Sequence, residues 1–160
     1  MSQQPMSDSI DSESVSASES NIDMNLYSRQ IGAYGVETMG KLVQLRVLIV
    51  GLRGIGVEAA KNVILAGPKS VTLLDNEAAR IQDLGTNFYL TPKHVNEGTP
   101  RAQACLEQLA ELNSYVEVSV STQSQIDAAF LRQFSVVVMC NQSMQVCVRV
   151  NKLCREHNVL

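Results

Sequence analysis

The chain has 160 residues, of which 45% are hydrophobic and 18% are charged, and its formal net charge at pH 7 is -3. This length suffices for one domain with a substantial core. A slightly acidic balance gives no electrostatic basis for binding nucleic acid or an anionic membrane, so we expect neither as a partner. No apolar run approaches the ~20 residues of a membrane-spanning helix.

The N-terminal segment 1–22 is rich in Ser and acidic residues and has almost no apolar side chains. Its ordering entropy could not be recovered by packing, so we predict a disordered tail. The segment lacks the features of a secretory signal or a transit peptide, which favours a protein of the cytoplasm, the nucleus or both. Two roles remain open for the tail: a phosphorylation target and a simple solvated leader.

Residues 23–160 are predicted to fold as one domain. Apolar residues at helical spacing predict a short helix that includes Val36, Met39, Leu42 and Val43. The run RVLIV predicts a strand at 46–50, a helical pattern over 54–67 ends at Gly67 and Pro68, and VTLLD predicts a strand at 71–75. Strand, glycine turn, helix and strand form the βαβ unit of a doubly wound, mainly parallel sheet of Rossmann-like α/β type.

The remaining pattern continues this alternation. We expect helices at 101–113, 126–134 and 144–157, and strands at 116–120 and 135–140. The final letters HNVL read as the opening of one more strand. We therefore expect the chain to be the first part of a longer domain.

The stretch GLRGIG at residues 51–56 resembles the glycine-rich turn of a dinucleotide-binding fold. Gly51 stands at the turn position and Gly56 at the packing position, with Gly54 between them, but Arg53 replaces the glycine that lets the backbone approach phosphates. Asp75 ends the second strand, where a ribose-binding carboxylate would sit. We expect a turn kept for folding rather than an NAD site, with Arg53 left to meet either a phosphate or another protein surface.

The four cysteines show neither a CxxC pair nor a His at zinc-finger spacing, so we expect neither a disulfide nor a metal site. We assign no catalytic nucleophile among them.

Five separated motifs, in order, carry a resemblance to a known family: YSRQIGAYG, GLRGIGVEAAKNVILAG, VTLLD, GTNFYL and AELNSYVEV. Together they resemble the ubiquitin-activating enzymes and their relatives that activate ubiquitin-like proteins. The resemblance implies a ThiF-like adenylation domain. That family pairs one active adenylation half with one that has lost its catalytic residues.

The departures of this chain from the active pattern identify it with the inactive N-terminal half. Arg53 replaces a glycine, Asp83 an Asn, and residues 85–87 an ATP-holding Asn-Arg-Gln run. Arg101 matches the phosphate-binding lysine with different geometry. Gln142 matches the magnesium-binding aspartate without its charge.

The resemblance implies that the chain is itself inactive and helps complete a site in which ATP and Mg²⁺, held mainly by the active half, adenylate the ubiquitin C-terminus. It also implies that Arg29 in YSRQ reaches in trans to the ATP phosphates of that half. Two alternatives stay open: the small regulatory subunit of a heterodimeric enzyme for another ubiquitin-like protein, and an autonomous nucleotide-binding Rossmann enzyme.

Overall fold

The computed structural model describes residues 25–160, so the predicted tail at 1–22 lies outside the described residues. The described residues divide into two compact units, with the boundary between Val43 and Gln44. The first unit contains one apolar cluster, and the second contains two.

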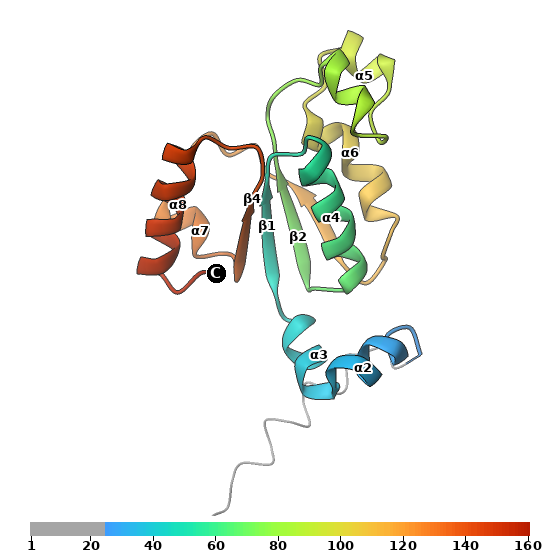
Figure 1. Cartoon of the computed structure of the whole chain (residues 1–160), viewed down its shortest axis with the longest axis vertical. Coiled ribbons are helices and arrows are strands. Elements are labelled where there is room, and N and C mark those ends of the chain that lie inside the picture. Colours follow the sequence, from blue (N-terminus) through green and yellow to red (C-terminus); the bar gives the residue numbers. More distant parts are fainter. Residues whose placement is uncertain (1–24) are drawn as a thin grey trace, which may run out of the picture. The chain divides into compact units, whose positions relative to one another are not determined.

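The described part of the first unit consists of two short helices, α2 (Ser28–Tyr34) and α3 (Val36–Leu42) (Figure 1). Gly35 separates them with a φ of 82°, a left-handed conformation that suits glycine. Tyr27 and Met39 form a buried cluster, and Ile31, Leu42 and Val43 pack against it. The helix expected from the apolar spacing is thus present as α3, whereas α2 was not predicted.

The second unit is built on a four-stranded parallel sheet in the order β3-β2-β1-β4. The strands are β1 (Arg46–Val50), β2 (Ser70–Leu74), β3 (Glu117–Val120) and β4 (Val136–Met139). Each lies within about one residue of its predicted position. Parallel strands require crossover connections, so this order confirms the predicted doubly wound α/β fold.

Helices cover both faces of the sheet, with α4 (Gly54–Ala66) and α6 (Arg101–Ala110) on one side and α7 (Ala128–Leu131) and α8 (Met144–Glu156) on the other (Figure 1). The alternation along β1 explains this division. Val47 and Ile49 join the apolar cluster under α4 and α6, while Leu48 and Val50 join the cluster under α7 and α8. Two-sided burial accounts for the continuous apolar run RVLIV.

The connection from β2 to α6 contains two elements that the apolar pattern did not predict, the 3₁₀ helix η1 (Ile81–Gly85) and α5 (Pro92–Asn96). Three predicted helices are also shorter in the structure, because α6 ends at Ala110, α7 at Leu131 and α8 at Glu156. Leu160 exchanges two backbone hydrogen bonds with the edge of β4, donating to Ser135 at 3.0 Å and accepting from Val137 at 2.7 Å. The backbone of the final residue therefore pairs as a strand would.

Candidate functional site

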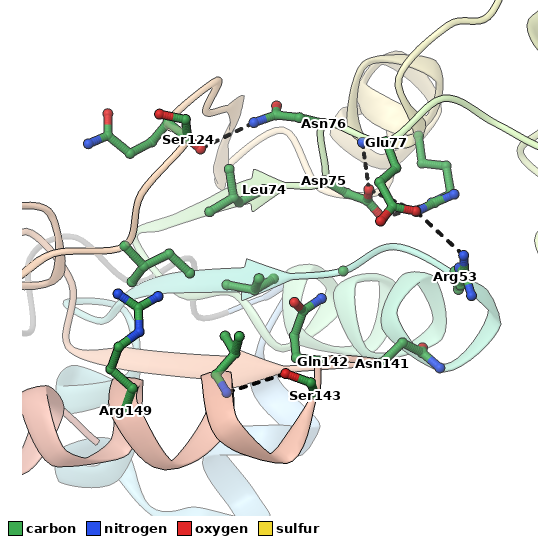
Figure 2. Close-up of a pocket in the computed structure, with 16 residues that line it drawn as sticks. Arg53, Leu74, Asp75, Asn76, Glu77, Ser124, Asn141, Gln142, Ser143 and Arg149 are labelled. Carbon is green, nitrogen blue, oxygen red and sulfur yellow. Dashed lines mark hydrogen bonds and ion pairs between the residues drawn. The ribbon is translucent and has the colours of Figure 1, made fainter.

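A cavity of about 680 Å³ lies at the carboxyl ends of the parallel strands (Figure 2). Its walls come from the segments that follow β1, β2, β3 and β4 and from the first turns of α6 and α8. In open α/β sheets ligands bind in the crevice outside the carboxyl ends of the strands. This cavity is therefore the candidate site, and it contains Gly51, Arg53, Asp75, Arg101 and Gln142.

The glycine turn between β1 and α4 is held by close backbone contacts. Gly51 has a φ of 87°, and a Cβ placed there would stand 2.1 Å from the carbonyl oxygen of Cys140. A Cβ on Gly56 would stand 1.8 Å from the carbonyl oxygen of Gly51, and one on Gly54 would stand 2.8 Å from Cβ of Thr86. All three glycines thus meet protein atoms at distances that no larger residue tolerates in place.

Arg53 occupies the N-cap of α4 with an extended backbone and a half-buried side chain. Its Nη2 lies 3.5 Å from Oε2 of Glu77, and its Nε lies 3.9 Å from Oδ1 of Asp83. The guanidinium that replaces the expected glycine therefore faces two carboxylates of its own chain.

Asp75 is buried directly after β2, and all of its acceptor capacity is used within the protein. Its Oδ2 accepts from the backbone N–H of Leu52 at 2.8 Å and from Nε of Arg101 at 2.8 Å. Its Oδ1 accepts from the backbone N–H of Glu77 at 3.1 Å and from Nη2 of Arg101 at 3.1 Å. A carboxylate offers about four lone-pair sites, and all four are filled here.

Arg101 begins α6, and its side chain is only 3% exposed. Besides its two bonds to Asp75, it donates through Nη1 to Oδ2 of Asp83 at 3.1 Å and to the carbonyl oxygen of Ala78 at 3.2 Å. Its Nη2 also donates to Oε2 of Glu77 at 2.8 Å. A guanidinium has five N–H donors, and each of them has a protein acceptor in this site.

The electrostatics of this cluster follow from its contacts. Burial acts to lower the pKa of Arg101, but the hydrogen bonds to Asp75 and Glu77 outweigh that effect and raise it. The hydrogen bond from Arg101 in turn holds the pKa of Glu77 below its usual range. Both shifts favour the charged forms of Glu77 and Arg101, so this ion pair is maintained near neutral pH.

Two further positions singled out by the sequence have structural contacts. Asn87 is 1% exposed, donates to the carbonyl oxygen of Leu52 at 3.0 Å and accepts from the N–H of Tyr89 at 3.1 Å, so it anchors the turn. Gln142 lies at the cavity wall and donates to the carbonyl oxygen of Cys140 at 3.1 Å. Arg29 lies in α2 of the first unit, where its side chain is exposed.

Sequence reasoning did not identify Glu77 or Arg149 as residues that line this cavity. Glu77 follows Asp75 by two residues, and this i, i+2 pair of acidic residues at a strand end was the available signal. Arg149 is exposed and projects from α8 toward the cavity, and no spacing pattern distinguished it from other helix arginines (Figure 2).

Among residues 25–160, no group of three or more His, Cys, Asp or Glu side chains is placed to hold a metal ion. Over the same residues, no helix is both long enough and apolar enough to cross a membrane. The four cysteines are free, and burial raises the pKa of the Cys105, Cys140 and Cys154 thiols. A raised pKa keeps these three groups in the protonated, less nucleophilic form.

A profile of the ThiF family matches residues 27–159, nearly the whole of the described chain. The chain belongs to the ThiF family. This finding agrees with the parallel sheet, the glycine turn and the resemblance stated from the sequence motifs.

Several long enzymes are similar to this chain. The "Ubiquitin-like modifier-activating enzyme 1" of Dictyostelium discoideum is 42% identical over 141 residues, which cover 88% of this chain and 14% of that enzyme. The human enzyme with the same description is 44% identical over 142 residues, and the "Ubiquitin-activating enzyme E1 1" of Candida albicans is 42% identical over 154 residues. The chain thus spans only 13% to 14% of the length of these relatives.

Among solved structures, the E. coli tRNA N6-threonylcarbamoyladenosine dehydratase TcdA has the same fold. The TM-score is 0.70 with 18% sequence identity, and the match covers 85% of this chain and 58% of TcdA. A structure of TcdA in complex with ATP matches equally well. At this identity the likeness concerns the fold alone.

Proposed function

We propose that this chain is part of a ubiquitin-activating enzyme, within the non-catalytic adenylation half. Its role is to pair with an active half of the same kind and complete the site for ATP-dependent adenylation of the ubiquitin C-terminus. The identity of 42% to 44% with ubiquitin-activating and ubiquitin-like modifier-activating enzymes supports the pathway.

The single observation that carries the non-catalytic assignment is the Arg101 cluster. The carboxylate that would bind a ribose and the cation that would bind a phosphate satisfy each other, at 2.8 and 3.1 Å. Gln142 adds no negative charge for Mg²⁺ and is engaged with a backbone carbonyl. The residues of this cavity therefore do not fit ATP and Mg²⁺, which we assign mainly to the active half.

Within this proposal, Arg29 supports the chemistry of the active half from outside it. An exposed arginine on a short helix can present a permanently charged, five-donor group to phosphates of another domain. Charge supplied in trans offsets negative charge on the departing pyrophosphate.

The test is ubiquitin-dependent exchange of pyrophosphate into ATP, measured for the chain alone and for the complete enzyme containing it. The chain alone should give no exchange. In the complete enzyme, Arg29→Ala should slow exchange, Arg29→Lys should restore part of the rate, and Arg155→Ala should leave it unchanged as a matched exposed control.

Exchange by the chain alone would overturn the non-catalytic assignment. A wild-type rate in Arg29→Ala would show that Arg29 is a surface residue with no role in adenylation. If the active half proves to be a separate polypeptide, the chain belongs instead to a heterodimeric enzyme for a related modifier. We propose the cytoplasm, the nucleus or both as the location of the complete enzyme.

A further inference from the structure

The Arg101 side chain satisfies, from inside the protein, the polar groups with which this cavity would bind a nucleotide. We infer that Arg101 is the residue that closes the cavity to nucleotides and replaces a ligand in holding its walls together. The inference deepens the proposed function, on which it rests for the interpretation of this cavity as a former nucleotide site.

The ribose side of the cavity is closed because Asp75 has no free acceptor. In dinucleotide-binding folds, an acidic residue in this region accepts hydrogen bonds from ribose hydroxyls. Here two backbone N–H groups and two Arg101 donors already fill Asp75. A hydroxyl entering the cavity would have to displace a charge-assisted bond of 2.8 to 3.1 Å, which is roughly twice as strong as a neutral one.

The phosphate side of the cavity is closed both by the negative charge of its carboxylates and because the donors of Arg101 are already used. Arg101 has no remaining donor, and the carboxylates of Glu77 and Asp83 stand between it and the turn before α4. Arg53 lies at that helix N-terminus but already faces these two carboxylates. A triphosphate would therefore meet negative charge where it needs uncommitted cations.

The same five bonds connect segments that a bound nucleotide would otherwise bridge. Through Asp75, Arg101 is joined to the turn after β1, where Leu52 donates its N–H. Through Ala78 and Asp83, it is joined to the chain after β2 and to η1. The cavity walls are thus held without a ligand, so nucleotides should leave the stability of the chain unchanged.

Lysine cannot reproduce this arrangement, because one ammonium group lacks the planar fork that engages several carboxylates at once. The three arginines at 53, 80 and 101 balance the three carboxylates of Asp75, Glu77 and Asp83. The double variant Asp83→Asn/Arg101→Lys frees acceptors on Asp75 and leaves the cluster with one excess positive charge. Both changes favour a polyanionic nucleotide.

The experiment titrates ATP with Mg²⁺, and separately adenosine, into the full chain, with calorimetry and thermal unfolding as readouts. Wild-type protein should show no saturable heat and no shift of Tm up to about 1 mM ligand. A Kd of about 1 mM corresponds to a binding free energy of about -4 kcal/mol. The double variant should bind ATP with a Kd of about 0.1 mM or below, which is at least tenfold below the limit set for the wild type. The matched control Arg149→Lys, at another arginine of the cavity wall, should behave as wild type.

Saturable ATP binding by the wild-type chain overturns the inference, whatever the variants do. A folded double variant that still ignores both ligands also overturns it, because Arg101 would then not be what excludes them. If the double variant lacks a cooperative thermal transition, Arg101→Lys alone takes its place with the same criteria. The inference can fail while the chain alone still shows no pyrophosphate exchange, so its failure is distinct from failure of the proposed function.

Discussion

Replacing Arg101 by Met tests whether the buried cluster stabilises the fold. Methionine roughly preserves the length of the aliphatic stem but removes all five hydrogen bonds, two of them to Asp75. The carboxylates of Asp75 and Asp83 would remain buried, at 5% and 7% exposure, without their main cation. Breaking a buried ion pair by removing one partner costs about 3–5 kcal/mol.

The remaining contacts place the expected loss at the lower end of this range. Asp75 keeps two backbone N–H donors, and Asp83 keeps the N–H of Arg80 at 2.9 Å with Arg53 at 3.9 Å. We therefore expect the free energy of unfolding to fall by about 3 kcal/mol. For a domain of this size, that loss lowers Tm by about 10 °C.

Urea unfolding at pH 7, followed by far-UV circular dichroism, measures this difference. Arg149→Met is the matched control, because that arginine is exposed and its loss should change stability by no more than about 0.5 kcal/mol. A cycle with Asp83→Asn should reveal coupling of roughly 1 kcal/mol between the two positions. A loss below about 1 kcal/mol in Arg101→Met would refute the view that the cluster holds the cavity walls.

Three other predictions follow from the same contacts. Gly56→Ala and Gly56→Val should each lower the free energy of unfolding by about 1–3 kcal/mol or more, because even a Cβ would lie 1.8 Å from the carbonyl oxygen of Gly51. Gly85→Ala is the control, because the space around Gly85 is open. An unchanged Tm for the Gly56 variants would contradict the packing argument. Because Arg101 lowers the folded-state pKa of Glu77, this carboxylate stabilises the fold above its unfolded pKa of about 4.3 and ceases to do so as the pH falls through its folded value. Glu77→Gln should thus be less stable than wild type at pH 7, with the gap closing below about pH 4 in a series of urea titrations; a constant gap would speak against the ion pair. Gln142→Asp alone should give no ubiquitin-dependent pyrophosphate exchange by the chain, because groups that act as a unit are not restored singly, and a signal above background would disprove this.

The sheet could be predicted because each strand carries a local signal. RVLIV and VTLLD are apolar runs bounded by glycine or by polar residues, and their two-sided burial requires this composition. The ends of helices were harder to predict, because contacts of individual side chains determine where a helix begins and ends. Asp127 accepts from the N–H of Phe130 and so starts α7 two residues after the predicted start at Ile126.

Two of the elements that were missed, η1 and α5, have no apolar periodicity. The helices η1 and α5 are short and mostly exposed, so burial gives them no repeating pattern. The η1 segment is also held by a tertiary contact, the hydrogen bond between the side chains of Arg101 and Asp83. Such contacts join residues far apart in the chain, and a sequence pattern does not reveal them.

The candidate site shows the same limit more sharply. Asp75 and Arg101 were each identified from the sequence, but separately, as a ribose-binding carboxylate and as the counterpart of a phosphate-binding lysine. They are 26 residues apart in the chain, and the connection through η1 and α5 to the start of α6 brings them within 2.8 Å. Two residues that favour ligand binding when considered singly thus exclude a ligand when they bind each other.

The persistence of the glycine turn has a steric explanation that does not involve a nucleotide. Gly51 needs its positive φ, and Gly56 must admit the carbonyl oxygen of Gly51 at a distance that excludes a Cβ. These requirements arise from the passage of β1 into α4 and hold whether or not the cavity is filled. Position 53 has no such requirement, because its backbone is extended and its side chain is half-buried, and an arginine is found there. In this chain, the glycines of the turn are explained by packing, and we attribute the exclusion of nucleotides to the filled acceptors of Asp75.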